Sequence, residues 1–277
     1  MTGLDWPVRH GGVALVTPSG VEERWVEGTD PSASWPVASV TKLLTTMAAL
    51  AAVDRGHLDL DRRVDPEGAT VRHLLAHAAG WPHTAGQGRR RPVGQHRIYS
   101  NTGFRLLGEA VADSVGTSFE TWLASAVLDP LGMRSTRLAE HDGVEADPAA
   151  GAVATLADLV LLARCLLGRG APVTGPKLFA EATTVQFPGL AGLVPGVGRF
   201  DPCDWGLGFE LRDRKQPHWM GERRSPAAFG HFGASGCFVW VDPEVELAAV
   251  AVTDRDFDDG RWAMATWPAW SDALPAA

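Results

Sequence analysis

The stretch of sequence that decides the fold reads PVASVTKLLTTMAALAAVDRG and covers residues 36–56. Its content of Ala, Leu and Met predicts a long helix from Ser39 to about Arg55, and Gly56 is suited to end it. Residues three apart on a helix lie on the same face, so Ser39 and Lys42 are expected to point the same way. A serine hydroxyl is a weak nucleophile at neutral pH, and a lysine amine within hydrogen-bond distance can activate it.

Lys42 can act as such a base only if its amine is partly or wholly neutral. The reference pKa of lysine is near 10.4, so burial or nearby positive charge must lower it. The alternative is that Ser39 caps the helix while Lys42 is a solvated residue of its first turn. A cation at a helix N-terminus is electrostatically unfavourable, which argues against that alternative.

A second element, Tyr99-Ser100-Asn101, lies about sixty residues downstream of Ser39. Tyr99 is the only tyrosine in a chain with 11 Trp and 10 Phe, which indicates that its hydroxyl is needed. A phenol flanked by ammonium or imidazolium groups can be partly ionised and act as a general base. The alternative is a core aromatic with a satisfied hydroxyl. Asn101 can donate to a substrate carbonyl or orient Lys42, and it can also cap the helix that follows.

A third element, His231-Phe232-Gly233-Ala234-Ser235-Gly236, precedes a predicted strand. The small residues Gly233 and Ala234 allow a substrate to lie against the strand edge. We expect the backbone N–H groups of Ala234 and Ser39 to form an oxyanion hole. Taken alone, His231 would be a loop histidine in most proteins.

Strands are predicted near both ends of the chain, and helices are predicted between them. The predicted strands are 13–16, 21–26, 205–211, 237–241 and 247–252, the last two forming an antiparallel hairpin. The predicted helices are 39–55, 70–77, 101–115, 119–128, 155–167 and a closing helix within 260–273. Residues 81–97 are predicted to be a loop, and 169–204 are rich in Pro and Gly and poorly periodic.

This order predicts an α+β fold in which an antiparallel sheet is assembled from both ends of the chain. We expect a sheet domain from residues 1–60 and 200–277 and a mostly helical domain from 61–199. The active site is expected at their interface.

The composition, 45% hydrophobic over 277 residues, allows a substantial core. The net charge of −8 argues against a nucleic-acid partner. No run approaches ~18 uninterrupted apolar residues, and no charged, apolar leader opens the sequence, so we expect no membrane partner and a cytoplasmic location. The expected partner is a small-molecule acyl substrate, and the expected state is a monomer or weak homo-oligomer.

For two of the cysteines and for the histidine pair His73 and His77, the sequence predicts a structural role rather than a catalytic or metal-binding one. The odd number of cysteines, Cys165, Cys203 and Cys237, does not suggest a disulfide framework. Cys165 and Cys237 lie in apolar runs and are predicted to be small buried residues rather than nucleophiles. His73 and His77 have metal-ligand spacing on a helix, but a third ligand is not evident, so no metal site is expected.

Two further groups lie close to the predicted motifs. The acidic cluster Asp254, Asp256, Asp258 and Asp259 is predicted to be a solvated turn, because it lacks the pattern of a calcium loop. Trp81 and Trp205 fall where the walls of a cleft are expected.

The three elements, in this order, resemble the motif series of the serine β-lactamase and penicillin-binding-protein superfamily. Tyr99-Ser100-Asn101 is similar to the Tyr-x-Asn motif of its class C, D-aminopeptidase and esterase-like branch. Residues 70–80, TVRHLLAHAAG, resemble that branch's Thr-Ile-Arg-His-Leu-Leu-Thr-His-Thr-Ser-Gly segment, and residues 129–133, DPLGM, resemble its Pro-Leu-Gly-Met stretch. The resemblance covers roughly residues 11–255.

The resemblance implies a β-lactamase/transpeptidase-like fold, with a sheet flanked by helices plus an inserted helical domain. It implies that Ser39 is the acylated nucleophile and that Lys42 and Tyr99 are the acid–base pair. Asn101 would support Lys42 and the substrate, and His231 replaces the more usual Lys of the third motif. Neither a metal nor an organic cofactor is implied.

The implied activity is a serine hydrolase acting on ester, amide or β-lactam substrates. His231 in place of Lys weakens the charge that would hold a β-lactam carboxylate, which gives weight to esters and amides. Two alternatives share these residues: an intracellular transacylase of a biosynthetic pathway, and a non-catalytic relative that only binds a ligand.

Overall fold

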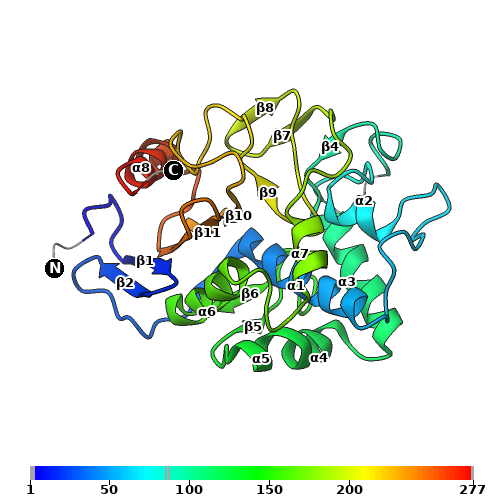
Figure 1. Ribbon diagram of the computed structural model, residues 1–277, viewed down its shortest axis with the longest axis horizontal. Helices are drawn as coiled ribbons and strands as arrows, with labels where there is room; N and C mark the ends of the chain where they lie inside the picture. Colours follow the sequence, from blue (N-terminus) through cyan, green and yellow to red (C-terminus); the bar gives the residue numbers. More distant parts are fainter. Residues whose placement is uncertain (1–3, 85, 87, 276–277) are drawn as a thin grey trace.

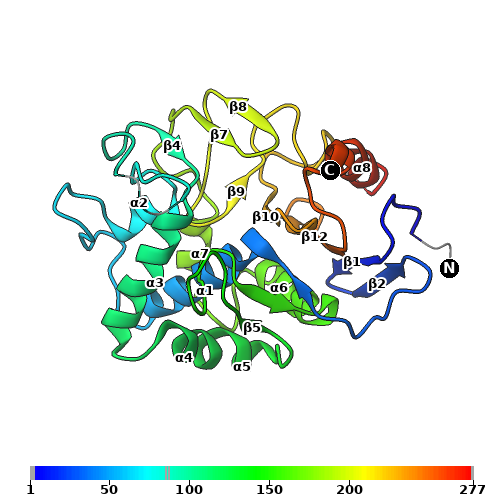
Figure 2. The same ribbon diagram turned by 180° about the vertical axis from the view of Figure 1, so that it is seen from behind.

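The computed structural model describes residues 4–84, 86 and 88–275 of the chain. Within these residues the largest sheet has six strands in the order β2-β1-β12-β11-β10-β9, so strands from the two ends of the chain pair with each other (Figures 1 and 2). Each pair of neighbours is antiparallel. The predicted antiparallel sheet built from both ends of the chain is therefore confirmed.

The strands of this sheet are β1 (Gly11–Thr17), β2 (Gly20–Trp25), β9 (Glu210–Leu211), β10 (Phe229–Gly233), β11 (Cys237–Asp242) and β12 (Leu247–Thr253). Two smaller sheets combine β3 (Trp35–Pro36), β6 (Ala152–Ala154) and β5 (Arg137–Leu138), and β4 (Arg97–Ile98), β7 (Gly192–Val194) and β8 (Gly198–Phe200).

The longer helices are α1 (Thr41–Asp54), α3 (Asn101–Val115), α6 (Leu156–Leu167) and α8 (Trp262–Asp272). Shorter helical segments are η1 (Ala38–Val40), α2 (Val71–Leu75), α4 (Phe119–Leu123), η2 (Ala124–Leu128), α5 (Asp129–Leu131), α7 (Pro176–Ala182) and η3 (Asp259–Arg261).

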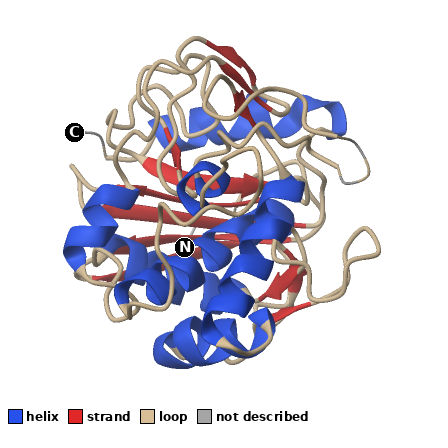
Figure 3. Ribbon diagram, turned by 90° about the vertical axis from the view of Figure 1, so that its right-hand side faces the viewer, coloured by secondary structure: helices blue, strands red, loops and turns tan. Residues whose placement is uncertain are grey.

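Helices cover both faces of the large sheet, which runs through the middle of the molecule in Figure 3. Val239 and Val250 belong to the core cluster that includes α1 and α6, whereas the neighbouring Phe238 belongs to the cluster around α8. The Phe238 and Trp267 ring centroids are 4.9 Å apart. A sheet buried on both faces explains why β11 and β12 read as continuous apolar runs rather than as alternating ones.

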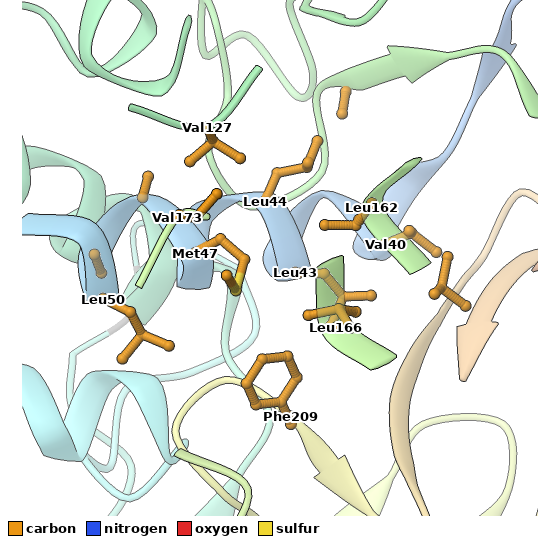
Figure 4. Packing of buried hydrophobic residues seen from close by; sticks show 14 of the residues in the cluster. Val40, Leu43, Leu44, Met47, Leu50, Val127, Leu162, Leu166, Val173 and Phe209 are labelled. Carbon is orange, nitrogen blue, oxygen red and sulfur yellow. The ribbon is translucent and has the colours of Figure 1, made fainter. Parts of the chain in front are cut away.

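Helix α1 passes through the larger core cluster, and its residues from Thr41 to Ala52 are all buried. Figure 4 shows Leu43 and Met47 of this helix among side chains that include Leu166 of α6 and Phe209. A helix that is apolar on all sides is expected to be buried. The polar residues at its first turn are thereby carried into the protein interior.

Three predicted elements differ in the structure. The strand predicted at 205–211 is confined to Glu210–Leu211, because Gly208 adopts a φ of +78° and lies against Thr46. The helix predicted at 119–128 continues past Pro130 and ends at Gly132, which has a left-handed backbone. Residues 169–204, which showed no clear period, contain α7 and the β7–β8 hairpin.

The predicted burial of Cys165 and Cys237 is confirmed. The three cysteines are free and buried, and burial raises the pKa of Cys165 to about 12 and that of Cys237 to about 11. Within the described part of the chain, no helix is long and apolar enough to cross a membrane. The domain boundaries at residues 60 and 200 stay a prediction.

Candidate active site

Ser39 and Lys42 come together at the start of α1. Ser39 lies in the short turn η1, and Lys42 Nζ is 3.2 Å from Ser39 Oγ. The turn is held by Thr41, whose hydroxyl donates to Ala38 O and accepts from Ala152 N–H. The alternative of a capping serine and a solvated lysine is wrong, because Ser39 makes no capping hydrogen bond and Lys42 is fully buried.

The amine of Lys42 has two further partners. It donates to Asn101 Oδ1 at 2.7 Å and to Ala149 O at 2.8 Å. Burial lowers the pKa of Lys42 to about 7, against the opposing effect of the Asp147 carboxylate. An amine with this pKa is partly neutral near pH 7, which is the condition that the sequence argument set for a base.

A partly buried ion pair fixes the segment that contacts Lys42. The Asp147 side chain accepts from Arg105 Nε at 3.2 Å and from Arg105 Nη2 at 2.9 Å. The same carboxylate accepts from Ala149 N–H at 2.9 Å, and the Ala149 carbonyl faces the amine of Lys42. Sequence reasoning missed Asp147 and Arg105, because no local pattern links them to Lys42.

Tyr99 lies beside the Ser39–Lys42 pair. Its ring centroid is 4.8 Å from Lys42 Nζ, and its hydroxyl is 3.4 Å from His231 Nε2. Burial raises the pKa of Tyr99, and a hydrogen bond with Ser39 opposes this only in part. The expectation that Tyr99 is partly ionised is therefore wrong for the resting site, where the phenol is neutral.

His231 is neutral as well. Its Nδ1 lies 2.7 Å from the Phe232 carbonyl, which can only accept, so Nδ1 carries the proton and Nε2 is left as an acceptor. Burial, together with the charge on Lys42, lowers the pKa of His231 to about 4. The third element precedes strand β11, as predicted, and its first three residues, 231–233, also form the end of strand β10, which the sequence did not predict.

The expectation that Asn101 orients Lys42 agrees with its contact, whereas the capping alternative is wrong. Ser100 is the N-cap of α3, and its Oγ accepts from Gly103 N–H at 2.8 Å. Asn101 is the first helical residue, so its side chain is free to accept from Lys42. The Ser100 N–H donates to His77 Nδ1 at 3.1 Å, which gives this histidine a structural partner.

Gly233 allows β10 to approach the segment before Ser39. A Cβ at Gly233 would lie 2.3 Å from Val37 O, closer than real atoms come. This approach places the next residue, Ala234, in the wall of the same cavity as Ser39. The Ala234 carbonyl accepts from Phe257 N–H at 2.8 Å, which fixes the orientation of this turn.

The cavity has a volume of about 210 Å³. Its wall includes Ser39, Tyr99, His231 and Ala234, and Trp205 stands in it as the sequence predicted. Trp81 does not line this cavity: the Arg89 guanidinium lies 4.7 Å from its ring centroid.

Glu210 is a wall residue of the cavity that sequence reasoning missed. Its buried carboxylate is 3.1 Å from His218 Nε2 and 2.8 Å from Trp219 Nε1, and the buried Lys215 amine lies 4.0 Å away. Burial alone would raise the pKa of Glu210, but the His218 hydrogen bond and the nearby charges lower it. The sequence signal was a lone acidic residue inside an apolar run.

The other candidates have structural contacts. His73 Nδ1 lies 2.8 Å from the Thr70 hydroxyl at the start of α2, and its ring stacks on Phe187. Among the described residues, no group of three potential metal-ligating side chains is placed to hold a metal ion. In the acidic cluster, Asp254 accepts from Arg9, and Asp258 is exposed at the rim of the cavity.

Comparisons with known proteins give the family of the chain and the fold it shares with solved structures. The family model described as Beta-lactamase matches residues 6–272. A beta-lactamase crystal structure from Mycobacterium bovis is 46% identical, with a TM-score of 0.89 over 97% of this chain and 94% of that chain. Penicillin-binding protein 4* of Bacillus subtilis is 25% identical over 134 residues, which span 37% of this chain and 30% of that protein.

A more distant structure has the same fold. Simvastatin synthase of Aspergillus terreus is 16% identical, with a TM-score of 0.73 over 96% of this chain and 90% of that chain.

Proposed function

The chain belongs to the Beta-lactamase family, and from this premise we propose that it is a serine hydrolase that forms an acyl-enzyme on Ser39. The substrates are small molecules with an ester, amide or β-lactam bond. The observation that carries the proposal is the 3.2 Å contact between Ser39 Oγ and a buried lysine amine whose pKa is about 7.

Acylation begins with proton transfer from Ser39 Oγ to the neutral amine of Lys42. The oxygen attacks the substrate carbonyl, and the backbone N–H groups of Ser39 and Ala234 bind the oxyanion that forms. In its neutral form the Lys42 amine has two N–H groups, which donate to Asn101 Oδ1 and Ala149 O, so its lone pair is directed to the hydroxyl of Ser39 at 3.2 Å. Preorganised groups of this kind stabilise the developing charges without further rearrangement.

Tyr99 is the proton donor for the leaving group. Its neutral phenol loses a proton when the bond to the leaving group breaks, and the ammonium of Lys42 then returns a proton to it. His231 Nε2, an acceptor 3.4 Å from the hydroxyl, orients the phenol. A water molecule attacks the acyl-enzyme by the reverse of these transfers, which regenerates Ser39.

The lack of charge on the His231 side chain affects which substrates the site can bind. A neutral imidazole offers no fixed positive charge for the carboxylate of a β-lactam. We therefore expect esters to be turned over faster than penicillins. The cytoplasmic location stays a prediction.

Transfer of the acyl group to an acceptor other than water is a second candidate. A hollow of about 840 Å³ shares Tyr99 with the cavity, and it offers space for such an acceptor. The third reading, a relative that only binds a ligand, requires that no substrate be turned over.

The test compares turnover of p-nitrophenyl butyrate and a penicillin by the wild type and by Ser39→Ala. The proposal predicts hydrolysis that the variant lacks, with the ester ahead of the penicillin. A rate that rises further with an added alcohol acceptor would favour acyl transfer. Hydrolysis that persists in Ser39→Ala would contradict the proposal.

A further inference from the structure

A second and larger hollow opens beside the cavity that contains Ser39. Its volume is about 840 Å³, and it lies between the loop before β4 and the β7–β8 hairpin, which are grouped together at the top of Figure 1. The two hollows share His83, Tyr99 and Pro195 as wall residues. A substrate bound at Ser39 can therefore extend past Tyr99 into the larger hollow, which we call the arginine groove.

The arginine groove is rich in positive charge. Arg90, Arg91 and Arg199 are exposed in its wall, and Asp201 is the acidic residue among those that line it. Within the described ranges, neither Arg91 nor Arg199 forms an ion pair with a protein carboxylate. The protein has a net charge of −8, but these arginines make the electrostatic potential at the groove locally positive.

A fourth arginine in the wall has a different environment. Arg97 is buried, and its guanidinium donates to Cys203 O at 2.9 Å and to Gln186 O at 2.8 Å. It therefore holds the β4 region in place and leaves the exposed arginines as the groups that can meet a ligand. Leu193, which is 47% exposed, adds an apolar surface beside them.

The position of Tyr99 sets the direction in which a substrate lies. A group that gives its proton to the leaving group must contact the leaving atom, and Tyr99 stands where the cavity meets the groove. Ala234, the proposed oxyanion donor, lines the cavity and is not part of the groove wall. The leaving group, rather than the acyl group, is thus the part of the substrate that extends into the groove.

We propose that the arginine groove binds an anionic group, a carboxylate or a phosphate, carried by the leaving group of the substrate. This inference rests on the proposed function, because it uses Tyr99 as the leaving-group acid. The exposed guanidinium groups of Arg91 and Arg199 offer paired N–H donors that match the oxygens of either anion. The bond that breaks is the ester or amide bond at Ser39, and the anion itself takes no part in the chemistry.

The experiment compares kcat/KM for butyrate esters that differ in charge but little in the reactivity of the leaving phenol. The 3-carboxyphenyl and 3-phosphonooxyphenyl esters carry the anion, and the 3-carbamoylphenyl ester is the neutral isostere. The mono-phenyl ester of glutaric acid carries its anion in the acyl group instead. We expect the wild type to prefer an anionic leaving group by roughly fivefold to tenfold, as two partly exposed ion pairs would give.

Arginine variants show which residues cause the preference for an anionic leaving group. In Arg91→Gln combined with Arg199→Gln, the ratio of anionic to neutral ester should fall to about one, because both guanidinium groups are removed. Arg134→Gln removes another exposed arginine that does not line the groove, and it should keep the wild-type ratio. Raising the salt concentration should reduce the ratio only where both groove arginines are present. The carboxylate and phosphate arms show which anion is preferred.

Several results would overturn the inference. A wild-type ratio near one would do so, as would a preference that the double variant retains. A preference only for the glutarate ester would place the anion on the acyl side and reverse the proposed direction.

Failure of the proposed function has a different signature, which is that no ester is turned over and Ser39 is not labelled. In that case, calorimetric titration of 3-hydroxybenzoate and phenyl phosphate into Ser39→Ala, with and without the arginine changes, still tests the groove. Binding that is lost with Arg91 and Arg199 supports anion recognition, and equal or absent binding in both proteins contradicts it.

Discussion

Lys42 Nζ lies 3.2 Å from Ser39 Oγ, at the first turn of a helix that is buried from Thr41 to Ala52. The contact depends on the core around it, because apolar packing on all sides of α1 removes water from the amine. Loss of hydration disfavours the charged form, which is why the pKa of Lys42 falls to about 7. The fold thus sets the chemistry of the pair as much as the motif does.

Lys42→Arg should abolish most of the activity while keeping a positive charge at the site. A guanidinium cannot become neutral near pH 7, so it cannot accept the proton of Ser39. We expect kcat/KM for p-nitrophenyl butyrate to fall by about 10²–10⁴-fold, the usual contribution of a general base. Lys177→Arg, an exposed lysine of α7, is the matched control and should retain wild-type rates. Wild-type activity in Lys42→Arg would exclude the lysine as the base.

The pH profile should show a limb near pH 7. The active form of Lys42 is the neutral amine, so kcat/KM should rise with pH through about 7 and level off above it. The lowered pKa of Lys42 also costs stability, because the unfolded lysine binds a proton more readily below its own pKa near 10.4. This cost grows as pH falls towards 7 and is constant below that value. A profile that declines through pH 7 would contradict the assignment.

Asp147→Asn should move that limb to lower pH. The Asp147 carboxylate raises the pKa of Lys42 against the effect of burial, so removing its charge lets the pKa fall further. The measurement is the midpoint of the kcat/KM profile, which a purely structural defect would not shift. Asp113→Asn, an exposed aspartate of α3, should leave the midpoint unchanged. A shift to higher pH in Asp147→Asn would reverse the electrostatic argument.

Tyr99→Phe should slow substrates according to the basicity of their leaving groups. An ethyl ester leaves as a basic alkoxide and needs a proton, so its hydrolysis should fall by about 10²–10⁴-fold. The p-nitrophenyl ester leaves as a stable anion, so its rate should fall less than about tenfold. Rates of both esters with the same acyl group provide the comparison. Equal losses for the two esters would show that Tyr99 does not protonate the leaving group.

Gly233→Ala should destabilise the protein and disturb the site together. The added methyl group would lie 2.3 Å from Val37 O, so β10 must move away from the segment before Ser39. We expect a loss of about 1–3 kcal/mol in the free energy of unfolding, measured by urea denaturation. Gly20→Ala is the control, since nothing lies within 4 Å of its Cβ position. Equal stabilities of the two variants would show that β10 tolerates the displacement.

The sequence predicted the residues that meet at the site because each motif is local. A Ser-x-x-Lys pair on a helix, a Tyr-x-Asn triplet and a small-residue turn can be recognised without knowing the fold. It did not predict the protonation states of Tyr99 and His231, since these depend on burial. It also missed the partner Ala149, which is 107 residues away from Lys42 along the chain.

For the secondary structure too, elements set by local sequence could be predicted, whereas elements set by contacts between distant segments could not. The β11–β12 hairpin and helix α1 follow from long apolar runs, whereas β9 is short because Gly208 packs against Thr46. That contact joins segments far apart in the sequence, so it cannot be predicted from the strand propensity of the local residues. Glu210 belongs to the same region, and its buried partners His218 and Trp219 could be found only in three dimensions.

The most direct test of the central claim is to trap the covalent intermediate. The protein is incubated with a fluorophosphonate and, separately, quenched with acid during turnover of p-nitrophenyl butyrate, and the mass is mapped to a peptide. The account predicts a phosphonyl or butyryl adduct on Ser39 that is absent in Ser39→Ala. No adduct with either reagent, or an adduct on another residue, would contradict acyl-enzyme chemistry at Ser39.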